Sequence, residues 1–303
     1  MRIAAHTAQT DPGRRRRRNE DAYVVEPPLF GVADGMGGPR AGEVASRLAA
    51  AAAKVETGGD GHGAERVVAV IQAANRSIYQ RSSEDEQTSG MGTTMTVAFF
   101  AEDEVTIGHV GDSRAYLARG GELEQLTDDH SLVAELVRGG KLSPEEAENH
   151  PQRSVITRAL GTDPDVDVDV FSIRPEAGDV FLICSDGLTT MLDDETILRV
   201  LEEHRGSLTK AAKALIGEAN RAGGEDNITV VAFEVTDEPD EGTMEMAAPA
   251  AVDPELEDTL TEADRVPTVE APPAERRGRR WWPLLVLLLA IVAAAVVLWF
   301  LTR

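Results

Sequence analysis

The first 235 residues contain short apolar runs separated by glycine, proline and charged residues, a pattern typical of buried β-strands. Strands are expected at 3–10, 22–26, 29–33, 93–100, 104–109, 113–118, near Leu123, and at 166–173, 179–185 and 227–235. Helices are expected at 41–55, 64–81, 194–203 and 208–222, the first because it is rich in alanine. Strands that cluster in the middle, with helix pairs outside them, predict an α+β domain rather than repeated βαβ units.

One segment, 129–161, interrupts the sheet pattern with an irregular helical pattern. Leu132, Leu136 and Val137 fall on one face of the expected helix. Because strand patterning resumes at 166–173, this segment is predicted to be an insertion between sheet elements.

The strongest hydrophobic signal lies at 284–301, where no charged residue interrupts the chain. Tryptophans stand at both ends, as in the aromatic belts of membrane-spanning helices. Segment 281–303 is therefore predicted to be a transmembrane helix, the alternative being a buried helix of a soluble protein. By the positive-inside rule, the arginine-rich stretch 276–280 predicts that the residues before it face the cytoplasm.

Charge is distributed unevenly along the chain. The formal net charge of -23 argues against a general nucleic-acid binder, because such proteins need a basic surface. Residues 236–275 are rich in Asp, Glu and Pro, with Arg265 as their only basic residue, so they are predicted to form a disordered linker. Cys184 is the only cysteine, which excludes an internal disulfide framework and cysteine-rich zinc sites.

The most informative polar residues are aspartates at the borders of apolar runs. Asp34 follows the run at 29–33 and precedes Gly35; considered alone, it could equally be a solvated turn residue. The same pattern recurs at Asp112, Asp186 and Asp226. A fifth aspartate, Asp21, directly precedes another apolar run. Without clusters of His or Cys, these carboxylates predict an all-oxygen site for Mg²⁺ or Mn²⁺. Two such cations can activate a water and stabilise phosphoryl oxygens, so a two-metal centre is expected.

Six motifs occur in a fixed order along the chain: 11–21 (DPGRRRRRNED), 34–38 (DGMGG), 91–94 (MGTT), 111–114 (GDSR), 185–187 (SDG) and 226–227 (DN). Together they resemble the metal-dependent PPM/PP2C protein phosphatases, in particular the bacterial membrane-anchored serine/threonine phosphatases. The resemblance spans about residues 1–235. It implies a four-layer αββα sandwich, in which two central antiparallel β-sheets are flanked by helix pairs. It also implies hydrolysis of phosphoserine and phosphothreonine in proteins by a water activated at a two-metal centre.

The resemblance also implies which residues hold the metals. Asp34 is expected to bridge two core Mn²⁺ or Mg²⁺ ions, with the Gly35 carbonyl joining the second. Asp112 is expected to help hold a possible third ion. The shell of the first ion is expected to be completed by Asp21, Asp186 and Asp226. Asp186 is also expected to help hold the third ion.

Two further roles follow from the same resemblance. Glu20 is expected to orient water beside the ions, and Arg16 to bind the substrate phosphate through its planar guanidinium. Residues 14–18 are all arginine, so this register depends on counting within the motif, and Arg15 or Arg17 could take the role. The arginine run could also bind anionic lipid as an additional role.

Some positions depart from the family pattern or have no assigned chemistry. Met36 and Pro39 stand where relatives carry a histidine, so the resemblance identifies no general acid. Segment 129–161 resembles the family's flap, and its His130 and His150 are interpreted as structural. Cys184 is interpreted as a core residue of a buried strand.

These interpretations predict a phosphatase domain at 1–235, the linker at 236–275, a basic juxtamembrane stop at 276–280 and the membrane helix at 281–303. The expected partners are phosphorylated proteins, including Ser/Thr kinases whose signalling the enzyme would reverse at the membrane, and no nucleic acid. A monomeric, cytoplasmic catalytic domain is expected, tail-anchored in the cell membrane by a single span. The alternatives are a catalytically weak phosphopeptide-binding scaffold and a phosphatase of a sigma-factor regulatory switch.

Overall fold

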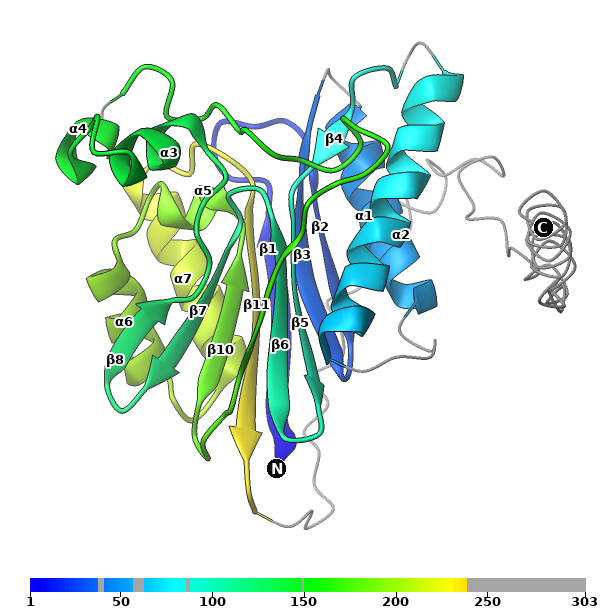
Figure 1. Ribbon diagram of the computed structural model, residues 1–303. Coiled ribbons are helices and arrows are strands. Elements are labelled where there is room, and N and C mark those ends of the chain that lie inside the picture. Colours follow the sequence, from blue (N-terminus) through cyan, green and yellow to red (C-terminus); the bar gives the residue numbers. More distant parts are fainter. Residues whose placement is uncertain (38–40, 57–62, 86–87, 149, 239–303) are drawn as a thin grey trace, which may run out of the picture. The chain divides into compact units, whose positions relative to one another are not determined.

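The computed structural model describes residues 1–37, 41–56, 63–85, 88–148 and 150–238 (Figure 1). The predicted linker beyond residue 238, the basic stop and the membrane helix lie outside these residues, as does Pro39. Within the described ranges, no helix is long and apolar enough to cross a membrane. The prediction for 281–303 therefore stays a prediction.

Two antiparallel sheets form the centre of the described domain. Their strands are β1 (Arg2–Asp11), β2 (Asp21–Glu26), β3 (Leu29–Met36), β4 (Gly92–Thr93), β5 (Met95–Ala101), β6 (Glu104–Val110), β7 (Arg114–Arg119), β8 (Glu122–Gln125), β9 (Asp169–Ile173), β10 (Val180–Cys184) and β11 (Ile228–Thr236). The five-stranded sheet has the order β1-β11-β10-β7-β8. The six-stranded sheet has the order β2-β3-β5-β6-β9, with β4 paired to β3.

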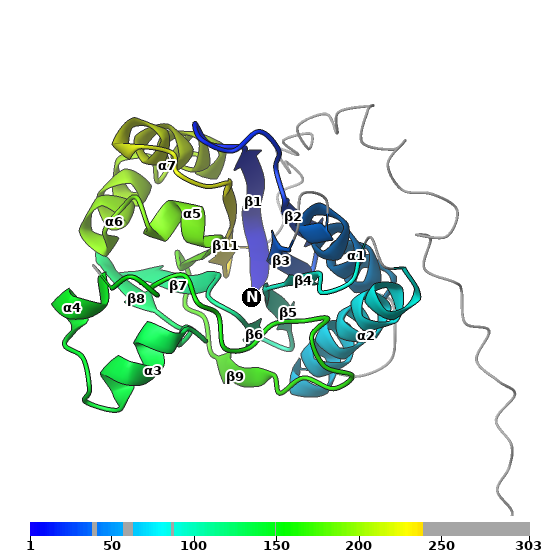
Figure 2. The ribbon, with the colours of Figure 1, turned by 90° about the horizontal axis from the view of Figure 1, so that it is seen from above.

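Helices cover the outer face of each sheet (Figures 1 and 2). The helices of the described residues are α1 (Ala41–Glu56), α2 (Gly63–Glu84), α3 (Leu132–Arg138), α4 (Pro144–Glu148), α5 (Asp186–Thr189), α6 (Asp194–Glu203) and α7 (Leu208–Ala222), of which α3 and α4 belong to the flap. The first two pack on the six-stranded sheet, and α6 and α7 pack on the five-stranded sheet. The alanines of α1 bring its backbone close to the strands, since Ala45, Ala49 and Ala53 are fully buried. The predicted α+β fold with antiparallel sheets is confirmed.

A third apolar cluster fills the space between the two sheets. Phe233 of β11 stacks on Phe30 of β3 with ring centroids 4.5 Å apart, and on Phe181 of β10 at 5.0 Å. β10 is buried along its whole length because a sheet covers one face and helices cover the other. This explains why segment 179–185 is a continuous apolar run rather than an alternating one.

Two expectations from the pattern were wrong in detail. β3 does not end before Asp34 but continues to Met36, because Asp34 pairs with Asp21 of β2 and Gly35 pairs with Thr93 of β4. Of the alternating segment 166–173, only its second half, β9, joins the sheet by pairing with β6. The helical pattern expected within 129–161 is present as α3, none of whose residues is fully buried.

The ring stack between the sheets generates a stability prediction. Phe233→Ala is expected to lower the free energy of unfolding by about 3–5 kcal/mol, because it leaves a cavity in a closely packed interior. Tyr79→Ala, which truncates a partly exposed ring on α2, is expected to change it by about 0.5 kcal/mol or less. Urea denaturation of both variants beside the unmodified protein measures the difference. Equal losses in the two variants would contradict the inter-sheet core.

Candidate active site

Five aspartates gather at one end of the paired sheets, since the charges of four of them act on the fifth, Asp34. Asp21 opens β2 and lies opposite Asp34 of β3. Asp112 lies in the turn between β6 and β7, Asp186 opens α5 directly after β10, and Asp226 shortly precedes β11. The antiparallel order places all five termini at the same end, so residues far apart in sequence meet there.

The proximity of these carboxylates is visible in their electrostatics. Burial raises the pKa of Asp34 well above its usual range, and the charges of the other four aspartates raise it further. Burial likewise raises the pKa of Asp21 to about 7, against two hydroxyl hydrogen bonds that lower it. For Asp112 burial raises the pKa to about 8, with the charge of Asp186 adding to the effect. Gathering these groups as anions requires a compensating positive charge.

The carboxylates also have oxygens free to bind a cation. One buried oxygen on each of Asp21, Asp112 and Asp186 has no hydrogen-bond partner. A buried carboxylate oxygen without a donor is costly unless a cation binds it, so these residues fit hard divalent ions. In the described ranges no three His, Cys, Asp or Glu side chains surround a single point closely enough to hold an ion alone. Water and carbonyl oxygens would therefore complete the shell, as they commonly do around Mg²⁺.

Asp21 shows how the fold prepares one such carboxylate. Its Oδ2 accepts hydrogen bonds from the hydroxyls of Ser185, at 2.8 Å, and Thr229, at 2.6 Å. Its Oδ1 is the oxygen that has no partner. The two hydroxyls come from the end of β10 and from β11, so the five-stranded sheet orients a carboxylate carried by the other sheet.

The backbone around Gly35 is packed too tightly for any side chain. A Cβ at this position would collide with the carbonyl oxygens of Gly42 and Glu20. The Gly35 N–H donates to the Glu20 carbonyl at 3.1 Å, which fixes β3 against the start of β2. Glu20 itself is partly buried, and burial raises the pKa of its carboxyl while the Arg16 charge opposes the rise. Their expected roles, a carbonyl ligand and a water-orienting carboxylate, stay predictions.

Among the five arginines of the run, Arg16 is the one that lines the pocket. Its Nη2 lies 2.6 Å from Oδ2 of Asp226. Arg15 lies 3.7 Å from Glu225, and Arg17 is not among the lining residues. The geometry therefore favours the register obtained by counting within the motif, although phosphate binding by Arg16 remains a prediction.

Asn227 fixes the arginine loop, a role that the sequence did not suggest. Its Nδ2 donates to the carbonyls of Pro12 at 3.0 Å and Arg18 at 2.8 Å, one at each end of the run. Its Oδ1 accepts from the N–H of Glu20 at 2.8 Å. One side chain thus holds the loop and the start of β2 together, next to the predicted metal ligand Asp226.

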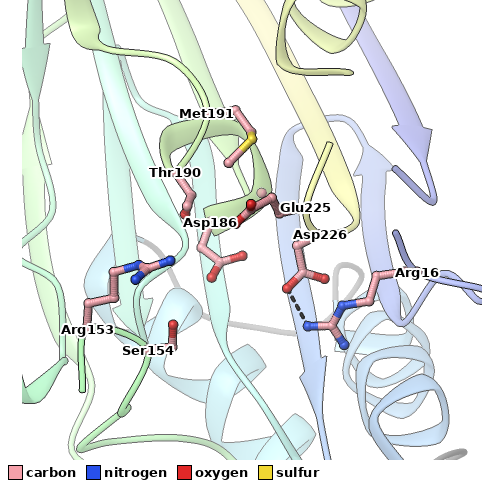
Figure 3. Close-up of a pocket in the computed structure, with 9 residues that line it drawn as sticks. Arg16, Arg153, Ser154, Asp186, Thr190, Met191, Glu225 and Asp226 are labelled. Carbon is pink, nitrogen blue, oxygen red and sulfur yellow. Dashed lines mark hydrogen bonds and ion pairs between the residues drawn. The ribbon is translucent and has the colours of Figure 1, made fainter. Parts of the chain in front are cut away.

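A cavity of about 210 Å³ opens beside these residues, lined from two sides (Figure 3). Asp186 and Asp226 form its carboxylate wall, and Arg16 approaches Asp226 from one side. Arg153 and Ser154 of the flap line the opposite side. Sequence reasoning missed both flap residues, because no periodicity or motif relates their exposed loop to the distant aspartates. The lining residues are Arg16, Arg153, Ser154, Asp186, Gly187, Thr190, Met191, Glu225 and Asp226.

The base of the flap is tied to the turn that carries Asp112. His130 donates its backbone N–H to the Gly111 carbonyl at 2.7 Å and accepts from the Gly111 N–H at Nδ1, 3.0 Å away. Its Nε2 lies 3.0 Å from Asp169, which also binds Arg158 at 2.5 Å. These contacts support a structural role for His130, as interpreted from the sequence. Burial lowers the pKa of this imidazole, so it packs as a neutral group.

Comparison with known proteins places the chain in a family. Residues 14–219 match the family model described as protein phosphatase 2C. The serine/threonine phosphatase Stp of Listeria monocytogenes is 41% identical over 245 residues, covering 75% of this chain and 94% of that protein. This chain therefore belongs to the protein phosphatase 2C family.

Solved structures agree in fold. The Mycobacterium tuberculosis serine/threonine phosphatase PstP superposes with a TM-score of 0.73 at 40% identity, covering 77% of this chain and 99% of that one. The catalytic domain of PstP solved with two manganese ions gives a TM-score of 0.72 at 39% identity, covering 78% and 99%. The prediction of Mn²⁺ or Mg²⁺ as cofactors is confirmed at the level of the family.

The raised carboxylate pKa values predict how the metal-free protein responds to pH. Asp21 and Asp112 titrate near 7 and 8 when folded but near 3.8 when unfolded, so between these values the folded state binds more protons. The free energy of unfolding should therefore fall as pH rises from about 5 to 8. Mn²⁺ at pH 8 should restore it, because the ion replaces the protons. Thermal unfolding in a chelator, with and without excess Mn²⁺, measures both effects. A metal-free melting temperature that rises over this range would contradict the prediction.

Proposed function

We propose that this protein hydrolyses phosphoserine and phosphothreonine in other proteins, using Mn²⁺ or Mg²⁺. The observation that carries the proposal is the juxtaposition of five aspartates, three of them with an unpartnered buried oxygen, with an arginine at the edge of one pocket. Carboxylates in this arrangement suit divalent cations, and a guanidinium suits phosphate oxygens. Family membership supports the same conclusion.

The cations, when bound, would supply an acidified water and neutralise charge on the phosphoryl oxygens. Asp34 and Asp21 face each other across β2 and β3, and with Asp186 and Asp226 they would hold the core ions. Asp112 borders the same carboxylates and suits a further ion.

Arg16 would position the phosphate. Its guanidinium pairs with Asp226, so phosphate oxygens would compete with that carboxylate for Arg16. Hydrolysis forms a bond between phosphorus and a water oxygen and breaks the bond between phosphorus and the seryl or threonyl oxygen; inorganic phosphate leaves, and the seryl or threonyl oxygen takes up a proton. The family resemblance identifies no general acid in this chain, and we propose solvent as the source of that proton.

Removal of Asp34 tests the proposal directly. Asp34→Asn keeps the size of the side chain but removes the central charge of the cluster. It is expected to lower Mn²⁺-dependent hydrolysis of a phosphothreonine peptide by at least about a hundredfold, since loss of a ligand's supporting contact alone typically costs 10–100-fold. Released phosphate, measured with excess Mn²⁺, gives kcat and KM for the variant and the unmodified protein.

Asp165→Asn is the matched control, because it removes an exposed carboxylate outside the site. It should retain the activity of the unmodified protein. If the unmodified protein and Asp34→Asn hydrolysed the peptide equally slowly, a catalytically weak phosphopeptide-binding scaffold would replace the phosphatase in this proposal.

We propose further that the protein is tail-anchored, with its catalytic domain in the cytoplasm. An uncharged stretch of bilayer-spanning length at 284–301, tryptophans at both ends and the arginines at 276–280 support this topology. A domain held at the membrane by an acidic linker meets membrane-bound substrates at raised effective concentration. Phosphorylated proteins, including Ser/Thr kinases, are the partners proposed on this basis.

Deletion of 281–303 provides the test of anchoring. The full chain should sediment with membranes and resist alkaline carbonate, whereas the deleted chain should remain in the supernatant. Replacement of 281–303 by an unrelated membrane span should restore sedimentation. Recovery of the full chain in the supernatant would contradict the proposed anchor.

The orientation of the domain has a separate test. In vesicles with the cytoplasmic face outward, added protease should digest the catalytic domain. Protection of that domain would contradict its proposed orientation.

A further inference from the structure

The geometry points to a substrate preference that rests on the proposed phosphatase function: the arginine loop, residues 14–18, selects phosphopeptides with acidic or additionally phosphorylated residues beside the scissile phosphate. Arg16 is the member of the loop that enters the pocket. Its neighbours on both sides carry the same charge, are exposed and do not line the pocket. They offer cations to side chains that flank the phosphorylated residue.

All five arginines are exposed, and their existing partners divide them into two groups. Arg15, Arg16 and Arg18 each lie within 4 Å of a carboxylate of this chain. Arg14 and Arg17 have no ion-pair partner among the described residues. These two guanidiniums are therefore available to an incoming anion without first giving up a partner.

The loop that carries them is held in place by its backbone. The N–H groups of Arg14 and Arg15 donate to the Gly224 carbonyl at 2.7 and 3.2 Å. Asp11 accepts from the Gly13 N–H at 2.9 Å and from Asn220 at 3.1 Å. Asn227 binds both ends of the run. A fixed backbone reduces the entropy lost when the side chains bind, so the charges are pre-organised around the pocket.

The position of these arginines next to the pocket suits the binding of a peptide better than the binding of a membrane. An extended peptide advances about 3.3 Å per residue, so residues within two positions of the phosphorylated one lie within reach of the arginines next to Arg16. A flat lipid surface resting on the loop would instead cover the pocket that Arg16 lines. The chain as a whole is strongly acidic, with a net charge of -23 that includes the five arginines of the loop, and would repel anionic substrates elsewhere. The loop is thus a local attractive site for an anionic segment entering the pocket.

The test compares three phosphothreonine peptides of equal length on the full chain in neutral detergent with Mn²⁺. One carries glutamate at the two positions on each side, one carries glutamine there, and one carries a second phosphothreonine two residues away. We expect kcat/KM for the glutamate peptide to exceed that for the glutamine peptide by about three- to tenfold, the effect of two exposed ion pairs. The doubly phosphorylated peptide should show at least the same preference, and 0.5 M salt should reduce both.

Arg14→Gln/Arg17→Gln should bring the ratio between acidic and neutral peptides close to one, whereas Arg14→Lys/Arg17→Lys should keep most of it. Arg76→Gln/Arg174→Gln removes two exposed arginines elsewhere, with the same change in net charge, and should leave the ratio unaltered.

A ratio near one in the unmodified protein, with hydrolysis of both peptides intact, would overturn the preference but leave the phosphatase function standing. No hydrolysis of any peptide would overturn both. If phosphatidylserine vesicles inhibited the unmodified protein, the glutamine variant escaped inhibition and the ratio was one, the loop would belong to a membrane surface instead.

Discussion

Mutual repulsion among buried carboxylates is the constraint on which the site depends. Asp34 lies among four other aspartates, and each raises the pKa of its carboxyl beyond the effect of burial. At neutral pH such a cluster must bind protons or cations. The unpartnered oxygens of Asp21, Asp112 and Asp186 are available to either. Bound cations would therefore neutralise the negative charge of the aspartate cluster, in addition to their role in phosphate hydrolysis.

The paired sheets provide the rigidity that such a cluster needs. Carboxylates that repel one another would separate if they stood on mobile loops, but here they stand at strand ends above a packed aromatic core. Contacts between the sheets reinforce the arrangement. Ser185 and Thr229 of one sheet orient Asp21 of the other. The stability of the inter-sheet core and the geometry of the metal site are consequently linked.

The sequence predicted those features that depend on local pattern. Short segments of the sequence are enough to predict the alanine-rich helix, the apolar run of β10 and the aspartates beside turn glycines. The order of the six motifs then predicted the fold through the family resemblance. Features created by distant contacts were not visible. β3 passes Asp34 because Asp21 and Thr93 pair with it, and Asn227 acts on carbonyls more than 200 residues away. Arg153 reaches the pocket through the path of the flap, which no periodicity encodes.

The two arginines at the pocket are held to different degrees. Arg16 stands on a loop whose backbone is bonded at several points to the segment before β11. Arg153 stands on the flap, whose helix α3 has no fully buried residue and whose described anchor is at its base. The loop that carries Arg16 is thus tied at both ends to the segment before β11, whereas the described ties of the flap lie at its base. In the proposed function, a substrate phosphate in the pocket would lie between the Arg16 and Arg153 guanidiniums, which line opposite sides of it. Differences in selectivity between enzymes with the same carboxylates should therefore arise at these two rims, since the carboxylate cluster itself has little freedom to vary.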